Sequence, residues 1–371
     1  MSGDALAGYL RAQATEFLRS LRQHRENGTD AGTSARAKPR TESRAESRDV
    51  SRDVSRDVSR DVSRDVSRDV SRAGETGSGE SVDAARALRR SARRISGTLH
   101  TFRPLLDAEW SEGMRPELAW LSGTLAREHA YAARLERLLG ALNRLSGAAG
   151  LPAQAAQNTG ASAKGSLTVG AAKAGALLDR QLTLARTRAH SAALQALGSS
   201  RFHAVADSVA VLASEVPLTP AAATADLRPL AAAATDRLTD AVTALPLVTA
   251  GHPYNAEALV HGLSADTAPH PQDAPWHQVR LLLRLHRYAC EVLYGEDAPI
   301  DVRLLRAGQA LNRHRDAAEA AAAAASAART PRIAPATAYA LGVLHADQRH
   351  EVEAARFAFQ QNWQKETVRT P

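Results

Sequence analysis

Apolar residues recur along most of this chain at the three- and four-residue spacing that is typical of amphipathic helices. The first such segment spans residues 4–23, and Gln13 is the polar interruption on its apolar face. Glycine supplies the backbone freedom that helix ends use, so we expect this helix to end at Asn27-Gly28. Its apolar positions are Leu6, Tyr9, Leu10, Phe17, Leu18 and Leu21.

From about residue 26 to residue 80 the pattern changes to a polar repeat. Six tandem copies of Ser-Arg-Asp-Val occupy residues 47–70, with Ser, Thr, Gly and Glu on both sides. One apolar residue in four is too little to bury, and a period of four matches no solenoid unit. We therefore interpret residues 26–80 as a disordered, near-neutral insert that acts as a spacer. A lone solvated helix is the alternative.

After residue 81 the helical spacing continues, interrupted by breaks rich in Gly, Pro, Ser and Thr at 146–169, 217–220 and 251–275. No segment shows the β-branched alternation of a strand bounded by turn residues. The sequence therefore predicts an all-α fold built as a bundle of long helices. The predicted helices are 82–106, 113–145, 171–197, 201–214, 224–245, 276–294, 301–328 and 335–365.

Two of these helices carry positive charge on one side only. At about 100° per residue, the charged positions of residues 82–106 share one arc, opposite Leu88, Ile95 and Leu99. A solvated helix face usually mixes both signs, and this one does not. The charged positions are Arg86, Arg89, Arg90, Arg93 and His100 in this helix, and His277, Arg280, Arg284 and Arg287 in the helix at 276–292.

The two charged helices are in register with each other. Arg89 and Arg280 lie 191 residues apart, and the pairs Arg93 with Arg284 and Arg86 with His277 keep the same offset. The equal offset predicts two duplicated halves that each contribute one cationic helix. If the halves pack about a pseudo-two-fold axis, both arcs line one shared groove.

The overall charge agrees with an anionic ligand. The 371 residues include 47 Lys+Arg against 40 Asp+Glu, which gives a net charge of +7 and a pI near 10.0. Arginine forks match phosphate and carboxylate oxygens bidentately, and a row of them suits a repeating polyanion. Aromatic residues make up only 4% and are scattered, whereas nucleic-acid recognition usually adds stacking aromatics. The pattern favours an inorganic polyanion, with nucleic acid as the alternative.

The sequence gives little support to a catalytic, metal-binding or membrane function. The chain lacks a phosphate-binding Gly-rich loop with Lys-Ser/Thr, a His-Glu-x-x-His helix and a Gly-x-Ser-x-Gly elbow. His345 and His350 lie five apart, off the spacing that lets one helix face hold a metal. We read Asp316 as a residue that orients arginines rather than as a catalytic acid. We thus expect no catalytic residues, no metal and no cofactor.

The remaining features concern the compartment. Cys290 is the single cysteine, which excludes an intramolecular disulfide framework. The first residues lack the basic-then-apolar order of a secretory signal, and no apolar run reaches the length of about 20 residues that a membrane span needs. We expect a cytoplasmic protein without a membrane partner.

Five segments, taken together and in order, resemble the CHAD family (conserved histidine α-helical domain): RRSARRISGTLHTFRPLL, WHQVRLLLRLHRYACEVL, LNRHRDAAEA, AYALGVLHADQ and FQQNWQK. The resemblance covers nearly the whole chain except the insert. It implies a first helix at 1–25, the insert at 26–80, and two pseudo-symmetric helical halves, 81–215 and 216–366, around a basic central groove. It also implies non-catalytic binding of inorganic polyphosphate, a place at polyphosphate granules, and a separate polyphosphate-processing enzyme as a partner.

The resemblance assigns a ligand-binding role to particular residues. In the first half, Arg86 stands where the family has His, Ser96 replaces its last arginine, and the expected Arg-Asp pair falls on His129 and Ala130. In the second half, Leu285 replaces a basic residue, while Tyr288 and Asp316 match. The predicted polyphosphate-binding residues are Arg86, Arg89, Arg93, Arg94, His277, Arg280, Arg284, Arg287 and His314.

Overall fold

The computed structural model describes residues 2–36, 83–147, 161–251, 271–295 and 301–364. Within these ranges the chain is helical apart from turns and one isolated bridge between Leu106 and Leu218, so the predicted all-α class is confirmed. None of the described helices combines the length and hydropathy that a membrane span requires.

The helices follow the predicted order. They are α1 (Ser2–Arg36), a helix over residues 83–101, α3 (Ala108–Leu145), α4 (Ala161–Leu197), α5 (Ser200–Ser214), α6 (Arg228–Thr243), α7 (Leu247–Ala250), α9 (Ala274–Tyr294), α10 (Val302–Ala328) and α11 (Pro335–Gln364). Short 3-10 turns cover Arg103–Leu105, Pro220–Ala223 and Pro271–Asp273.

Side-chain caps explain several helix starts. Asp107, Ser199 and Asp301 each accept a hydrogen bond from a backbone N–H in the first turn of α3, α5 and α10. Such a bond satisfies one of the four N–H groups that a helix start leaves without an intrahelical partner.

The two largest errors in the predicted helix boundaries concern α1 and α4. Helix α1 continues through Asn27-Gly28 to Arg36, because one glycine costs a helix only about 1 kcal/mol and does not end it by itself. Helix α4 begins at Ala161 rather than at 171, within a stretch read as a break. The rest of the predicted insert, residues 37–80, lies outside the described residues.

Three clusters of buried apolar side chains hold the helices together. The first joins α1, helix 83–101, α3 and α5 around Phe17, Phe102 and Phe202. The second joins α6, α9, α10 and α11 around Trp276 and Phe359. The third, defined here as the bridging cluster, joins the C-terminal part of α3 and α4 to α10 and α11.

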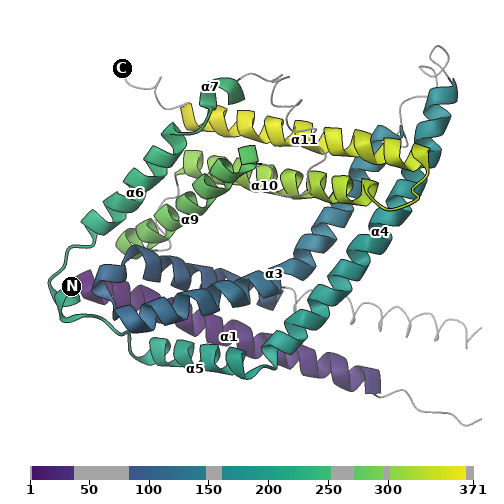
Figure 1. The fold of residues 1–371 in the computed structure, drawn as a ribbon. Coiled ribbons are helices and arrows are strands. Elements are labelled where there is room, and N and C mark those ends of the chain that lie inside the picture. The colour runs from purple at the N-terminus through teal and green to yellow at the C-terminus, as the bar shows by residue number, and fades with distance from the viewer. Residues whose placement is uncertain (1, 37–82, 148–160, 252–270, 296–300, 365–371) are drawn as a thin grey trace, which may run out of the picture.

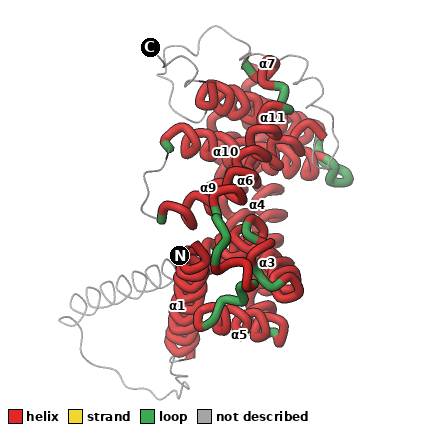
Figure 2. Tube along the Cα trace, turned by 90° about the vertical axis from the view of Figure 1, so that its left-hand side faces the viewer, coloured by secondary structure: helices red, strands yellow, loops and turns green. Residues whose placement is uncertain are grey.

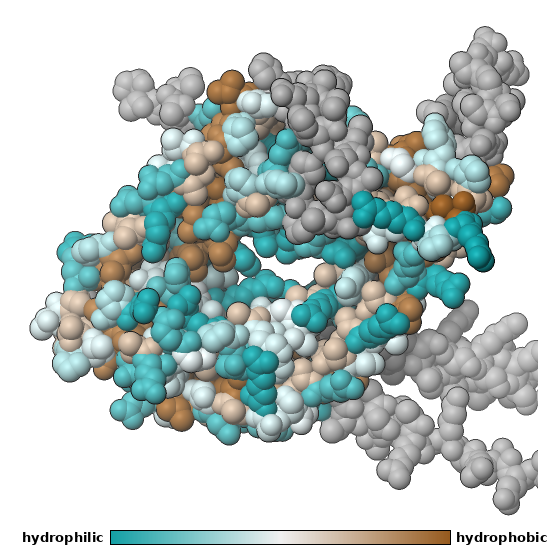
Figure 3. All heavy atoms as spheres, viewed as in Figure 1, coloured by the Kyte–Doolittle hydropathy of each residue, from teal (hydrophilic) through white to brown (hydrophobic). Residues whose placement is uncertain are grey.

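The clusters give the molecule two ends and an opening between them. Figures 1 and 2 both place α1 and α5 at one end and α10 and α11 at the other, with α4 extending between the two. Figure 3 shows the surface hollowed near the centre, with hydrophilic residues around much of the opening.

Candidate functional site

Burial of one face turns the charged face of helix 83–101 away from the core. Leu88, Ile95 and Leu99 are fully buried in the first cluster, so the arginines on the opposite face point out of it. In α9, Trp276 and Val279 are buried in the same way.

The two charged helices touch where Gly97 faces Tyr288. A Cβ on Gly97 would lie 2.5 Å from Cδ2 of Tyr288 and 3.2 Å from Cδ2 of Leu285, so a larger residue there would force these side chains to shift. Glycine therefore allows this close approach of two segments far apart in the sequence.

A cavity of about 420 Å³ lies next to this contact. Arg93 from helix 83–101, Arg280 and Arg284 from α9 and Arg315 from α10 line it, and we name it the arginine cavity. The predicted convergence of the two cationic helices on one groove is thus confirmed. The other lining residues are Ala92, Ser96, Gly97, His100, Arg115, Leu118, Ala119, Ser122, Gly123, Ala126, Leu281, Leu285 and Tyr288.

The guanidinium groups around the arginine cavity repel one another. Burial, followed by repulsion from Arg93 and Arg315, lowers the pKa of Arg89 to about 10. Burial and the charges of Arg284 and Arg315 lower the pKa of Arg280 to about 10 as well. Both groups remain protonated at neutral pH. The cavity therefore concentrates positive charge in a partly dehydrated space, where an anion is attracted more strongly than in bulk water.

Several donors at this site have no acceptor. The buried Nε atoms of Arg89, Arg280 and Arg284 have no hydrogen-bond partner within the described residues. A buried donor without an acceptor costs free energy, and an anionic oxygen in the cavity removes that cost.

Two of the cavity arginines are held by neutral groups. Arg93 Nε donates to Ser122 Oγ at 3.0 Å, and Arg280 Nη1 donates to Asn312 Oδ1 at 3.3 Å. Neutral acceptors orient a guanidinium without cancelling its charge. Arg315 differs, because its Nε donates to Asp316 Oδ1 at 3.0 Å, which confirms that Asp316 orients an arginine.

Arg94 and Arg287, two of the predicted ligand-binding residues, instead share Glu291. This carboxylate accepts hydrogen bonds from Arg94 Nε at 2.9 Å, Arg287 Nε at 2.8 Å and the Tyr9 hydroxyl at 2.7 Å. Burial alone would raise the pKa of Glu291, but the bonds from Arg94 and Tyr9 lower it overall. Glu291 therefore ties α1, helix 83–101 and α9 together, and neither arginine lines the cavity.

His314 occupies the core rather than the cavity. Its side chain is 1% exposed, its Nε2 lies 3.5 Å from Asp273 Oδ1, and its ring stacks on Trp276. Burial lowers the pKa of His314 to about 4, so the ring is neutral at pH 7. The structure therefore places the predicted ligand-binding residue His314 outside the lining of the cavity, and Arg349 and Arg356 converge on the same buried Asp273.

Arg86 and His277 lie at the margin of the site. Arg86 is exposed and paired with Asp83 at 3.1 Å. The His277 ring is 5.5 Å from that of His314, and burial lowers its pKa. Both residues stand about one helical turn before Arg89 and Arg280, outside the lining of the cavity.

The sequence patterns missed two cavity arginines. Arg115 and Arg315 both line the cavity, but each is adjacent to acids in the sequence or structure, namely Glu112 for Arg115 and Asp316 for Arg315. Because acids lie beside these two arginines, they do not form a helix face of one charge sign, which is the pattern that identified the other arginines. His129, at the position of an expected arginine, has a pKa lowered by burial.

A helical fold in which arginines from distant helices surround one cavity agrees with a CHAD domain, and the CHAD domain family matches residues 67–323. The chain belongs to this family. Among solved structures it is similar to PptA from Streptomyces chartreusis, at 67% identity over 98% of this chain and 99% of that chain, with a TM-score of 0.72. A comparison with curated proteins finds no match.

Proposed function

We propose that the protein binds inorganic polyphosphate in the arginine cavity without catalysing a reaction on it. The observation that carries this proposal is the composition of the lining. Arg93, Arg280, Arg284 and Arg315 come from three helices, and no carboxylate lines the cavity within the described residues. Membership of the CHAD family supports the same ligand.

The arrangement suits a linear polyanion better than a single phosphate. Arg280 and Arg284 follow the helical pitch of α9, and Arg89 and Arg93 follow that of helix 83–101. Successive charges therefore repeat about every 6 Å along each helix. A cavity of about 420 Å³ exceeds the size of one phosphate group and provides donors on more than one wall.

Binding alone explains the site more simply than hydrolysis. Cleavage of a phosphoanhydride usually needs a metal held by carboxylates or a positioned base. Within the described residues no group of three His, Cys, Asp or Glu side chains is placed to hold a metal ion. We further propose that the protein associates with polyphosphate granules through this cavity and that a separate enzyme processes the polymer.

The test is a titration of the full chain with long-chain polyphosphate at several salt concentrations. Neutralising several phosphates releases counterions, so we expect the logarithm of the binding constant to fall linearly with the logarithm of salt. Arg280→Glu and Arg284→Glu should each weaken binding at least about tenfold. Arg313→Glu, an exposed position on α10 outside the cavity lining, is the matched control.

Two results would overturn the proposal. One is a salt-independent response, or no binding at low salt. The other is release of phosphate when the pure protein is incubated with polyphosphate and magnesium, which would show that the protein catalyses hydrolysis. Competition with RNA addresses the nucleic-acid alternative, and we expect RNA to displace polyphosphate poorly because Tyr288 is the one aromatic residue among the described lining.

A further inference from the structure

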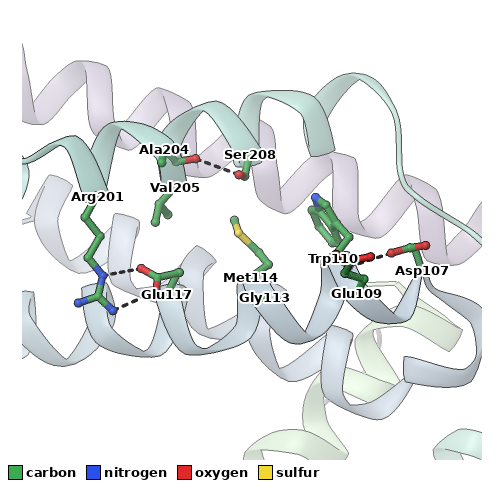
Figure 4. A pocket seen from close by; sticks show the side chains of 10 residues that line it. All are labelled: Asp107, Glu109, Trp110, Gly113, Met114, Glu117, Arg201, Ala204, Val205 and Ser208. Carbon is green, nitrogen blue, oxygen red and sulfur yellow. Dashed lines mark hydrogen bonds and ion pairs between the residues drawn. The ribbon is translucent and has the colours of Figure 1, made fainter.

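A second hollow lies on the far side of α3, between α3 and α5. It has a volume of about 550 Å³ and is drawn in Figure 4. Met114 and Val205 point toward each other across it, and Trp110 lies further along the same wall. We name this hollow the α3–α5 groove. Met114 and Val205 form its buried apolar floor, and Arg201 is the one cation among its described lining residues.

The rim of the α3–α5 groove is acidic. Asp107, Glu109 and Glu117 line it together with a single cation, Arg201. Arg201 is already satisfied, because it donates to both oxygens of Glu117 at 2.6 and 3.0 Å and covers the ring of Trp120 at 4.1 Å. Asp107 and Glu109 therefore leave excess negative charge at the other end of the groove, on a chain whose net charge is +7.

Helix α3 separates this groove from the arginine cavity. Glu109, Gly113 and Glu117 are spaced by four residues and share one face. Leu118 and Ser122, which line the arginine cavity, lie roughly 180° around the same helix. Opposite faces of one helix thus carry sites of opposite charge, and a ligand in one does not block the other.

We propose that the α3–α5 groove binds a cationic, amphipathic helical segment of a partner protein. Apolar side chains of such a segment fit against the half-buried Trp110 and the exposed Ala204, and its flanking Lys or Arg residues pair with Asp107 and Glu109. Gly113 leaves room for the side chains of the bound segment, since no atom lies within 4 Å of a Cβ built at Gly113. A free polyamine would use the carboxylates but leave the apolar floor unfilled.

The consequence is that the protein joins a basic partner to the polyanion in the arginine cavity. The groove itself is independent of the polyphosphate proposal, whereas this coupling rests on it. In a protein of net positive charge, specific binding of a cationic segment requires a local acidic site, and the groove provides one.

The test uses a labelled peptide of roughly 14 residues, which spans four helical turns. Leucines are spaced i, i+3, i+4 and i+7 along the peptide so that they share one helix face. Lysines occupy all other positions. A second peptide carries glutamate in place of every lysine. Binding to the full chain is followed by fluorescence anisotropy without polyphosphate, and polyphosphate binding is measured separately. We expect the lysine peptide to bind and the glutamate peptide not to bind.

Two glycine variants form a matched pair. Gly113 and Gly123 both lie in α3 and both have open space where a Cβ would stand, but Gly113 faces the groove and Gly123 faces the arginine cavity. Gly113→Leu should weaken peptide binding at least about tenfold and leave polyphosphate binding unchanged. Gly123→Leu should do the reverse.

Three outcomes would overturn the groove proposal without touching the polyphosphate proposal. They are absence of binding by the lysine peptide, equal binding of both peptides, and full retention of peptide binding in Gly113→Leu. Complete displacement of the peptide by spermidine at an equal concentration of positive charge would also overturn it, and would assign the groove to polyamines.

Discussion

At the scale of residues, the buried charged groups fall into two classes, those paired with opposite charges and those without such a partner. Glu291 and Asp273 are buried carboxylates that each accept from several cationic donors, so these charges are compensated. Arg93, Arg280 and Arg284 of the cavity are partly buried and have no such carboxylate, whereas Arg115 and Arg315 are paired with Glu112 and Asp316. The compensated groups hold helices together, and the uncompensated ones remain available to a ligand.

Replacing Glu291 tests the first role. Glu291→Gln removes the charge that compensates the half-buried Arg94, so we expect the free energy of unfolding to fall by roughly 3 kcal/mol. Urea unfolding followed by circular dichroism measures the loss. Glu16→Gln, which breaks an exposed pair with Arg19, should cost less than about 1 kcal/mol. Equal losses in both variants would contradict this role.

His314 should make stability depend on pH. Its pKa is about 4 in the folded protein against an ordinary value of 6.5, so between these values the unfolded chain binds the proton and the folded chain does not. The free energy of unfolding should therefore decrease as pH falls from 6.5 to 4, by up to about 3 kcal/mol from this residue. His314→Gln should show a smaller decrease over the same range. Identical slopes of unfolding free energy against pH would contradict the assignment.

At the scale of elements, small residues decide where helices meet. Gly97 allows helix 83–101 to reach α9, and Gly170 allows α4 to reach α11, since a Cβ on Gly170 would overlap the carbonyl oxygen of Ala336. Alanines have a similar part in α10, where they form most of the buried positions. The arginine cavity depends on these contacts because they fix the helices that carry its charges.

The contact at Gly170 predicts opposite effects for two similar substitutions. Gly170→Ala places a methyl group against backbone that cannot rotate away, so we expect a loss of about 1–3 kcal/mol. Gly8→Ala, within α1 and with open space at its Cβ, should stabilise by up to about 1 kcal/mol. Melting temperatures of the two variants measure the difference, and equal shifts would show that the α4–α11 contact is looser than described.

At the scale of the whole molecule, the two ends depend on each other. Leu138 and Leu178 of α3 and α4 pack in the bridging cluster with Leu341 and Leu344 of α11. Separation of the chain near residue 215 would expose this apolar surface on both pieces.

We therefore expect residues 1–215 and 216–371 to fail to fold when each is produced alone. Each piece should bind a hydrophobic dye and lose the near-ultraviolet circular dichroism of the full chain. Production of both pieces together should restore part of the native signal, because the bridging cluster then reforms. A sharp, cooperative melting transition in either isolated piece would contradict this expectation.

The sequence predicted the helices well because each is long and periodic, and the errors have local causes. The start of α4 was missed because Gly and Ser resemble a break, although Gly170 is a packing residue. The cavity arginines of helix 83–101 and α9 were found because their helix faces carry one sign of charge. The burial of His314 was not predicted because its partners Asp273 and Arg356 are distant in sequence, so this burial is a property of the tertiary fold alone.

The mutual repulsion of the guanidinium groups at the arginine cavity links the lifetime of this protein to its ligand. Mutual repulsion of Arg93, Arg280 and Arg284 makes the empty form less stable than a form in which an anion lies among them. Proteases cut molecules that open transiently, and the population that opens follows the free energy of unfolding. If the anion is polyphosphate, turnover of the protein would slow while the polymer is plentiful and quicken once the cell has consumed it.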